Sequence, residues 1–243
     1  METLHSQFYM IYQPIKQVNC SKKAEGKSSE RHYEALLRSV ETNRFPLKDF
    51  PSLIQDEESN ACFLDWVVPQ FIEQLEQHPD VVLSVNFDVD QWAYPSTFEA
   101  VEKLFPYKEQ IIIEVTEHQP RFNHSIMKIY GEILKEVSQR GFKIAVDDIG
   151  QGINTFPFFL KYLRYFSRVK VAVYDKRCFL KPRFYLLTNK VLKCFGRPQM
   201  EIVVERVETE EMSRRLKAIG ICLQQGRLFG MGERHVKAEE ALT

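Results

Sequence analysis

The stretch KIAVDDIGQG, residues 143–152, has the pattern that decides the fold predicted for this chain. Its first half is a short apolar run typical of a buried strand. Its second half carries two adjacent carboxylates, Asp147 and Asp148, followed by glycines. A strand that ends in polar residues before a glycine-containing turn is typical of the carboxyl end of a parallel strand, where active sites are built. Two neighbouring carboxylates repel each other, so their adjacency requires a reason.

The same kind of run recurs along the chain and alternates with segments of helical spacing. Eight strand-type runs occupy residues 8–15, 32–38, 81–87, 111–117, 142–148, 168–173, 201–208 and 221–226. Apolar residues recur at intervals of three and four within 62–77, 96–105, 125–139, 184–195 and 209–220, which predicts one-sided helices. This alternation predicts an α/β fold, a TIM-like (β/α)8 barrel, in a single domain spanning residues 1–243. The polar segment 16–30 is too poor in apolar residues for a packed crossover helix, so the first strand is expected to be irregular and antiparallel to the second.

The composition excludes several classes of partner. Lys and Arg together number 33, as do Asp and Glu, so no global field recruits a DNA or RNA polymer or an anionic membrane surface. The chain shows no signal-peptide pattern, and no stretch approaches the ~18 apolar residues of a membrane span. The cysteines at 20, 62, 178, 194 and 222 form no CxxC pair or zinc spacing and are expected to be reduced core residues. We therefore expect a cytoplasmic protein.

Polar side chains fall in or at the ends of successive strand runs: Glu34, Asn86, Glu114, Asp147, Asp148, Lys170, Glu205 and Gln225. In a parallel barrel one pocket collects such residues. A single strand glutamate is usually a salt-bridge partner or an exposed edge residue. Five carboxylates that converge on one lysine, however, would be costly to bury unless they protonate or bind cations. Carboxylate and amide oxygens without Cys or His favour Mg²⁺ or Mn²⁺.

Eight short stretches carry a resemblance to a known family, and they follow one another in the right order over nearly the whole chain. They are YQPI (12–15), YEALLR (33–38), SVNF (84–87), EVTE (114–117), VDDIGQG (146–152), RVKV (168–171), ERVET (205–209) and QGRLFG (225–230). Each stretch is weak evidence by itself. Together they resemble the EAL-domain phosphodiesterases, which hydrolyse the bacterial messenger cyclic di-GMP.

This resemblance implies roles for individual residues. Metal-binding positions are matched by Glu34, Asn86, Glu114 and Asp147 for one cation, and by Asp147, Asp148 and Glu205 for a second. Two cations in such sites lie ~3.5–4 Å apart, and a bridging Asp147 beside Asp148 would explain the adjacency. The implied reaction is hydrolysis of cyclic di-GMP to linear pGpG by a water that two Mg²⁺ or Mn²⁺ ions activate, with Lys170 and Glu205 as catalytic residues.

Other positions match substrate-binding and loop-ordering residues of the family. The substrate-binding positions are Gln13, Leu36, Arg38 and Gln225, and the loop-ordering positions are Glu117 and Glu208. Arg38 suits a phosphate because its planar fork donates two parallel hydrogen bonds, but it could equally pair with Glu41 on the surface. The aromatic segments 156–166 and 178–187 are assigned to packing, with a homodimer contact as the alternative.

The chain also departs from the family pattern. Ala172 stands where an acidic residue is usual after the strand-six lysine, and the ending 230–232 lacks the usual proline. The loop after the aspartate pair reads IGQGINT, where FGTGYSS is usual, so that Gln151, Ile153 and Asn154 are altered. Arg206 replaces the usual glycine after Glu205, where its charge either meets the substrate phosphate or competes with a metal for carboxylates.

These departures leave three interpretations open. The chain is an active phosphodiesterase, a receptor that binds cyclic di-GMP with little or no turnover, or a regulator that binds a protein partner through the barrel surface. The complete ligand set and Lys170 favour the first.

Overall fold

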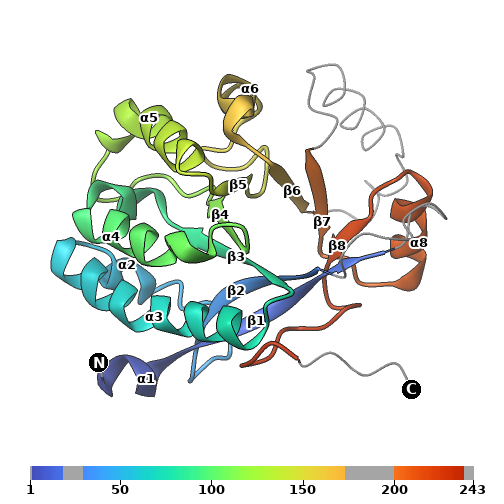
Figure 1. Ribbon diagram of the computed structural model, residues 1–243, viewed down its shortest axis with the longest axis horizontal. Coiled ribbons are helices and arrows are strands. Elements are labelled where there is room, and N and C mark those ends of the chain that lie inside the picture. The colour runs from blue at the N-terminus through green and yellow to red at the C-terminus, as the bar shows by residue number, and fades with distance from the viewer. Residues whose placement is uncertain (1, 19–29, 173–199, 238–243) are drawn as a thin grey trace.

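The computed structural model describes residues 2–18, 30–172 and 200–237. Its strands are β1 (Phe8–Gln17), β2 (Arg31–Ser39), β3 (Val81–Phe87), β4 (Ile111–Val115), β5 (Lys143–Val146), β6 (Arg168–Ala172), β7 (Glu201–Glu205) and β8 (Leu223–Gln225). They close into a barrel in chain order (Figure 1). β1 is antiparallel to both of its neighbours, β2 and β8, and the remaining neighbours pair in parallel. The predicted α/β barrel with an antiparallel first strand is therefore confirmed.

Helices cover the outside of the barrel. They are α1 (Glu2–Gln7), α2 (Phe50–Leu53), α3 (Glu57–Gln77), α4 (Pro95–Leu104), α5 (Ile126–Gln139), α6 (Phe156–Tyr162) and α8 (Glu210–Ala218), with 3-10 turns η1 (Val89–Ala93), η2 (Phe105–Tyr107) and η3 (Leu163–Tyr165). α3, α4 and α5 cover one side of the barrel, and α8 lies on the opposite side (Figure 1). The short helices α1, α2 and α6 were not among the predicted helices, and the helix expected at 184–195 lies outside the described residues.

Side-chain alternation along the strands separates two environments. Ala35, Ile113 and Val171 belong to the large apolar cluster that joins the sheet to the helices. Because successive strand residues point to opposite faces, their neighbours Glu34 and Glu114 point into the barrel. The barrel interior also holds two small apolar groups, Ile15 with Val203 and Leu223, and Val82 with Ile112 and Ala145. The polar site is therefore built into the interior face of the same strands that form the core.

Arg168 occupies the amino-terminal end of the barrel interior and is completely buried. It donates hydrogen bonds from Nε to Glu201 (2.9 Å) and from Nη1 to Ser84 (3.3 Å), and Nη2 lies 3.1 Å from His32 Nδ1. Burial, together with the charge of Arg168, lowers the pKa of His32 to about 4. A neutral His32 therefore accepts the hydrogen bond from Arg168 at neutral pH. Polar groups at this end of a barrel serve stability rather than catalysis.

Three expectations outside the barrel core can now be compared with the structure. Cys222 is disulfide-bonded, so the expectation of a reduced cysteine is wrong there. Cys62 is a free thiol as expected but is exposed and not in the core, and the cysteines at 20, 178 and 194 lie outside the described residues. Phe159 and Phe166 are buried and stacked, which confirms a packing role within the first aromatic segment, 156–166, whereas 178–187 is not described.

Within residues 2–18, 30–172 and 200–237, no helix is long and apolar enough to span a membrane. The cytoplasmic location stays a prediction.

Candidate active site

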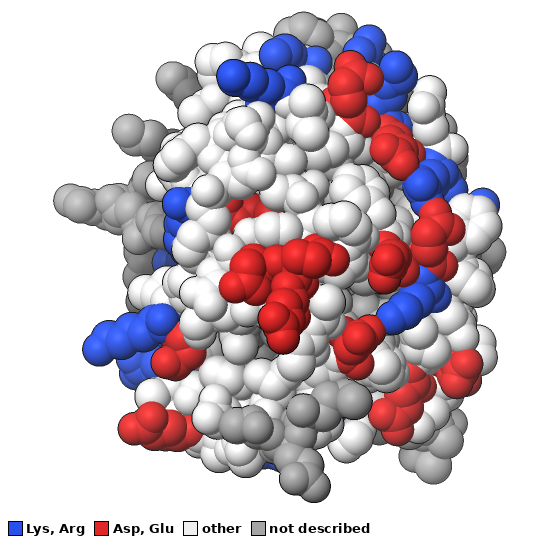
Figure 2. Space-filling view, turned by 90° about the vertical axis from the view of Figure 1, so that its left-hand side faces the viewer, with Lys and Arg blue, Asp and Glu red and all other residues white. Residues whose placement is uncertain are grey.

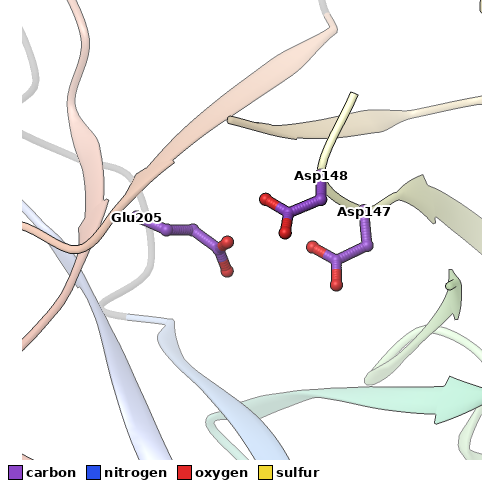
Figure 3. Close-up of side chains that lie close together, drawn as sticks. All are labelled: Asp147, Asp148 and Glu205. Atoms are coloured by element: carbon purple, nitrogen blue, oxygen red, sulfur yellow. The ribbon is translucent and has the colours of Figure 1, made fainter. Parts of the chain in front are cut away.

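Three carboxylates meet above the carboxyl ends of two strands. Asp147 and Asp148 follow β5, and Glu205 is the last residue of β7. Their oxygens lie within 4.8 Å of one another, which is close enough to hold one metal ion. Figure 3 shows the two aspartates and the glutamate pointing toward a common space. These are the three residues predicted around the second cation.

The backbone of the loop after β5 explains how adjacent aspartates reach the same space. Asp148 has a left-handed conformation with φ of 42°, so the strand alternation stops there. The amide of Gln151 donates to the carbonyl of Asp148 at 3.0 Å, and the amide of Ile153 donates to the carbonyl of Glu117 at 2.9 Å. A Cβ atom on Gly152 would lie 1.7 Å from the Glu117 carbonyl, so this close approach requires glycine. Glu117 thus contacts the loop through its backbone carbonyl.

Lys170 lies at the centre of the carboxylates and is 1% exposed. Its Nζ is 2.8 Å from Glu114, 2.8 Å from Glu205, 3.0 Å from Glu34 and 3.2 Å from Asp147. Asp148 lies beside Asp147 and Glu205, so the site holds five carboxylates and one ammonium, an excess of four negative charges when all are ionised. Lys170 therefore contacts carboxylates from β2, β4, β7 and the residue after β5, but it cannot neutralise the site.

The pKa values show how the protein distributes this excess charge. Burial and neighbouring carboxylates, only partly offset by Lys170, raise the pKa of Glu114 to about 8 and that of Asp147 to about 6. The same causes raise the pKa of Glu205 well above its ordinary value. Burial would also raise the pKa of Glu34, but the charge of Lys170 and two amide hydrogen bonds hold it below its ordinary value. Without added cations, protons must therefore occupy part of the site at neutral pH.

The donor set suits a hard divalent cation. Asn86 Nδ2 donates to Glu34 Oε1 at 2.9 Å, which leaves the amide oxygen of Asn86 as a donor atom for a cation. Gln225 Nε2 donates to Glu34 Oε2 at 2.7 Å. Within the described ranges, Glu114 Oε1 and Gln225 Oε1 are buried oxygens with no hydrogen-bond partner. Oxygen donors of this kind fit Mg²⁺ or Mn²⁺ better than a zinc site.

Two pockets open on either side of the carboxylates and share Glu34, Leu36 and Asp147. One has a volume of ≈ 400 Å³, and Gln13, Lys170, Glu205, Arg206, Glu208 and Gln225 line it. The other has a volume of ≈ 260 Å³, and its lining includes Arg38 and Glu117 together with Phe45, Phe50, Phe63 and Phe71. The structure therefore brings all the predicted substrate-binding and loop-ordering residues to the edge of the carboxylate group.

Two of the residues that line the pockets, Arg38 and Glu208, form hydrogen bonds within the protein. Arg38 donates from Nη1 to the carbonyl of Leu37 at 2.9 Å, and burial lowers its pKa. In the described part of the chain Arg38 forms no ion pair with Glu41, so the alternative of a surface pair is wrong. Glu208 accepts a hydrogen bond from Arg227 at 2.8 Å.

Figure 2 shows that acidic side chains gather at the centre of one face of the molecule, with basic side chains mostly nearer its edges.

Two features of the site were not predicted from the sequence. Asn154 is completely buried and donates its side-chain amide to backbone carbonyls beside the aspartate pair. His118 Nδ1 lies 2.7 Å from Asp88, which ties the loop after β4 to the turn after β3. Asn154 reaches Val115, 39 residues away, and His118 reaches Asp88, 30 residues away, so no local pattern points to these contacts.

Comparison with known proteins identifies the family to which this chain belongs. The family model described as "EAL domain" matches residues 2–231, and the chain belongs to this family. It is 25% identical over 232 residues to cyclic di-GMP phosphodiesterase CdgJ of Vibrio cholerae serotype O1, covering 89% of this chain and 46% of that protein. The chain thus spans about half the length of this relative.

Solved structures show the same architecture. A standalone versatile EAL protein from Vibrio cholerae O395, in a c-di-GMP-bound form, is 25% identical with a TM-score of 0.66, covering 97% of this chain and 96% of that one. The Bacillus subtilis YkuI protein, in complex with c-di-GMP and calcium, is 18% identical with a TM-score of 0.72, covering 99% of this chain and 60% of that one. At 18% identity, the similarity to YkuI shows a shared fold and nothing more.

Proposed function

We propose that this chain is a metal-dependent phosphodiesterase that hydrolyses cyclic di-GMP to linear pGpG. The observation that carries the proposal is the convergence of four carboxylates on Lys170, with Asp148 beside two of them, at the edge of two pockets. Membership of the EAL family supports the same substrate, as does the similarity to a cyclic di-GMP phosphodiesterase and to an EAL protein in a c-di-GMP-bound form. In this proposal residues 1–243 form a single EAL-type domain.

Two cations are proposed per site. One would be held by Glu34, Asn86, Glu114 and Asp147, and the other by Asp147, Asp148 and Glu205. Bound Mg²⁺ or Mn²⁺ would supply Lewis-acid chemistry and a water of lowered pKa. The oxygen-only donor set of the carboxylates and Asn86 supports this assignment.

The chain's own groups are placed to do the remaining work. Lys170 carries a positive charge because four surrounding carboxylates raise its pKa well above the ordinary value, although burial alone would lower it. A buried ammonium here is placed to orient the attacking water and to offset charge that develops on phosphate oxygens. Arg38, at the rim of the apolar pocket, is placed to donate to a phosphate with its guanidinium fork. Gln13 and Gln225 lie together, since Gln225 Nε2 donates to Gln13 Oε1 at 3.1 Å.

The second candidate is a domain with little or no turnover. Such a domain would act as a receptor for cyclic di-GMP or as a regulator that binds a protein partner. The observation that favours it is the pair of departures that meet at Glu205. Ala172, which lacks a carboxylate, lies opposite Glu205 in the β6–β7 register, and Arg206 follows it. We also propose that the chain is cytoplasmic and that it can form a homodimer.

One experiment separates these functions. The purified chain is mixed with cyclic di-GMP and Mn²⁺ or Mg²⁺, and bound and hydrolysed dinucleotide are measured in parallel, with EDTA as the control. Metal-dependent hydrolysis to a linear dinucleotide supports the phosphodiesterase. Binding without hydrolysis supports the receptor, and the absence of both supports the protein-binding regulator.

A further inference from the structure

We infer that Asn154 is a positioning residue that holds Asp147 and Asp148 in the conformation that the two proposed cations need. This inference rests on the proposed function, because it assumes that cations bind at the aspartate pair. Asn154 does not reach the reacting atoms. It acts through the peptide group between the two aspartates.

The side-chain amide of Asn154 joins the ends of two adjacent strands. Its Nδ2 donates to the carbonyl of Asp147 at 2.6 Å and to the carbonyl of Val115 at 3.0 Å. Val115 is the last residue of β4, and its carbonyl also accepts from the amide of Asp147 at 3.0 Å. Asn154 is 0% exposed, so water does not replace these bonds. The amide therefore continues the β4–β5 connection one step beyond the regular ladder.

This hydrogen bond controls the orientation of both carboxylates. The carbonyl of Asp147 belongs to the peptide plane that also sets φ of Asp148, which is 42°. A left-handed residue with a side chain costs roughly 1–2 kcal/mol, so it persists only where surrounding contacts fix it. The backbone of Asn154 adds to the restraint, since Gly150 N donates to its carbonyl at 2.7 Å and its own N donates to Gln151 at 2.9 Å. The loop is thus closed around the peptide plane.

Asparagine suits this position chemically. An amide nitrogen carries two donors, which match the two carbonyls, whereas a hydroxyl carries one. Among the described residues, Asn154 Oδ1 has no hydrogen-bond partner although it is buried. Reversing the amide would place this oxygen against two carbonyl oxygens. Asn154, which stands where a serine is usual in the family, therefore supplies the hydrogen bonds that order the two aspartates.

The test compares two substitutions with a matched control. Asn154→Leu keeps the approximate size and removes both donors, and Asn154→Ser keeps one donor. The control is Asn60→Leu, because Asn60 is also 0% exposed and donates to Ser96 (2.8 Å) and Thr97 (2.9 Å), away from the carboxylates. Binding of Mn²⁺ alone is measured by calorimetry and by electron paramagnetic resonance, alongside thermal unfolding, kcat and KM.

We expect Asn154→Leu to weaken Mn²⁺ binding about 10- to 100-fold, the size of effect typical of residues that orient ligands, with Asn154→Ser in between. Asn60→Leu should lower the unfolding temperature while Mn²⁺ affinity stays at the wild-type value. If both leucine variants lose affinity equally, or if Asn154→Leu binds Mn²⁺ as the wild type does, the inference is overturned. Should Asn154→Leu not fold, an unchanged affinity in Asn154→Ser overturns it. A wild-type chain that binds no Mn²⁺ would remove the proposed function itself.

Discussion

The Nζ of Lys170 lies 2.8 Å from Oε2 of Glu114, and both side chains are almost completely buried inside the barrel. This pair stands at the centre of the site, because the same ammonium also contacts Glu34, Asp147 and Glu205. Removing one partner of a buried ion pair leaves an uncompensated charge and typically costs 3–5 kcal/mol.

The first prediction follows from this arrangement. Lys170→Met should abolish hydrolysis and destabilise the metal-free protein by roughly 3 kcal/mol at pH 8, where Glu34 and Asp147 are ionised and Glu114 is about half ionised. Added Mn²⁺ should restore much of this loss, since a bound divalent cation stabilises the folded state. Denaturant unfolding with and without Mn²⁺ measures both effects. Equal stability of the variant and the wild type in EDTA would contradict the central position of Lys170.

Asp147 and Glu34 should differ in their effects on stability, although both are proposed ligands. Asp147→Asn should lower turnover at least ~100-fold without lowering the stability of the metal-free protein, because the pKa of Asp147 is raised and its ionised form is therefore disfavoured. Glu34→Gln should lose turnover and stability together, because the pKa of Glu34 is held below its ordinary value by favourable contacts. Unfolding curves in EDTA at pH 7 separate the two. A destabilised Asp147→Asn would show that its carboxylate is structural.

The buried His32 predicts a pH dependence of stability. Its pKa falls from 6.5 to about 4 on folding, so the unfolded chain takes up a proton first as the pH is lowered. The stabilising contribution is complete above pH 6.5 and disappears as the pH falls toward 4, a change of roughly 3 kcal/mol.

His32→Gln keeps an acceptor for Arg168 but does not titrate in this range. The difference in unfolding free energy between wild type and variant should therefore change between pH 7 and pH 4, which denaturant titrations at each pH measure. Subtraction removes the contribution of the site carboxylates, which titrate in both proteins. A constant difference would mean that the pKa of His32 is the same in the folded and the unfolded chain.

Arg206 combines backbone strain with a place in the open pocket. It is exposed, lines this pocket and has φ of 60°. Arg206→Gly should raise the unfolding free energy by about 0.5–1 kcal/mol, because relief of a left-handed side chain exceeds the entropy that glycine loses on folding. Its exposed position favours contact with substrate phosphate over competition with a metal. KM for cyclic di-GMP should then rise several-fold at an unchanged Mn²⁺ midpoint, whereas a lowered midpoint would support competition.

The sequence predicts the barrel well because strand alternation and helical spacing are local signals. Glu114 and Lys170 could be placed in one pocket because each lies within a strand run whose carboxyl end faces the same opening. The left-handed conformation of Asp148 could not be foreseen, since aspartate rarely adopts it without outside support. That support comes from Asn154 and Val115, 39 residues apart, and a hydrogen bond between such segments leaves no periodic trace.

The most direct test of the proposed phosphodiesterase is a single-turnover measurement with enzyme in excess over cyclic di-GMP. The account predicts that Mn²⁺ or Mg²⁺ converts the bound dinucleotide to linear pGpG, that EDTA stops the conversion, and that Asp147→Asn binds the dinucleotide without converting it. Persistence of intact cyclic di-GMP on the wild-type chain at saturating metal would contradict it and leave a receptor in place of an enzyme.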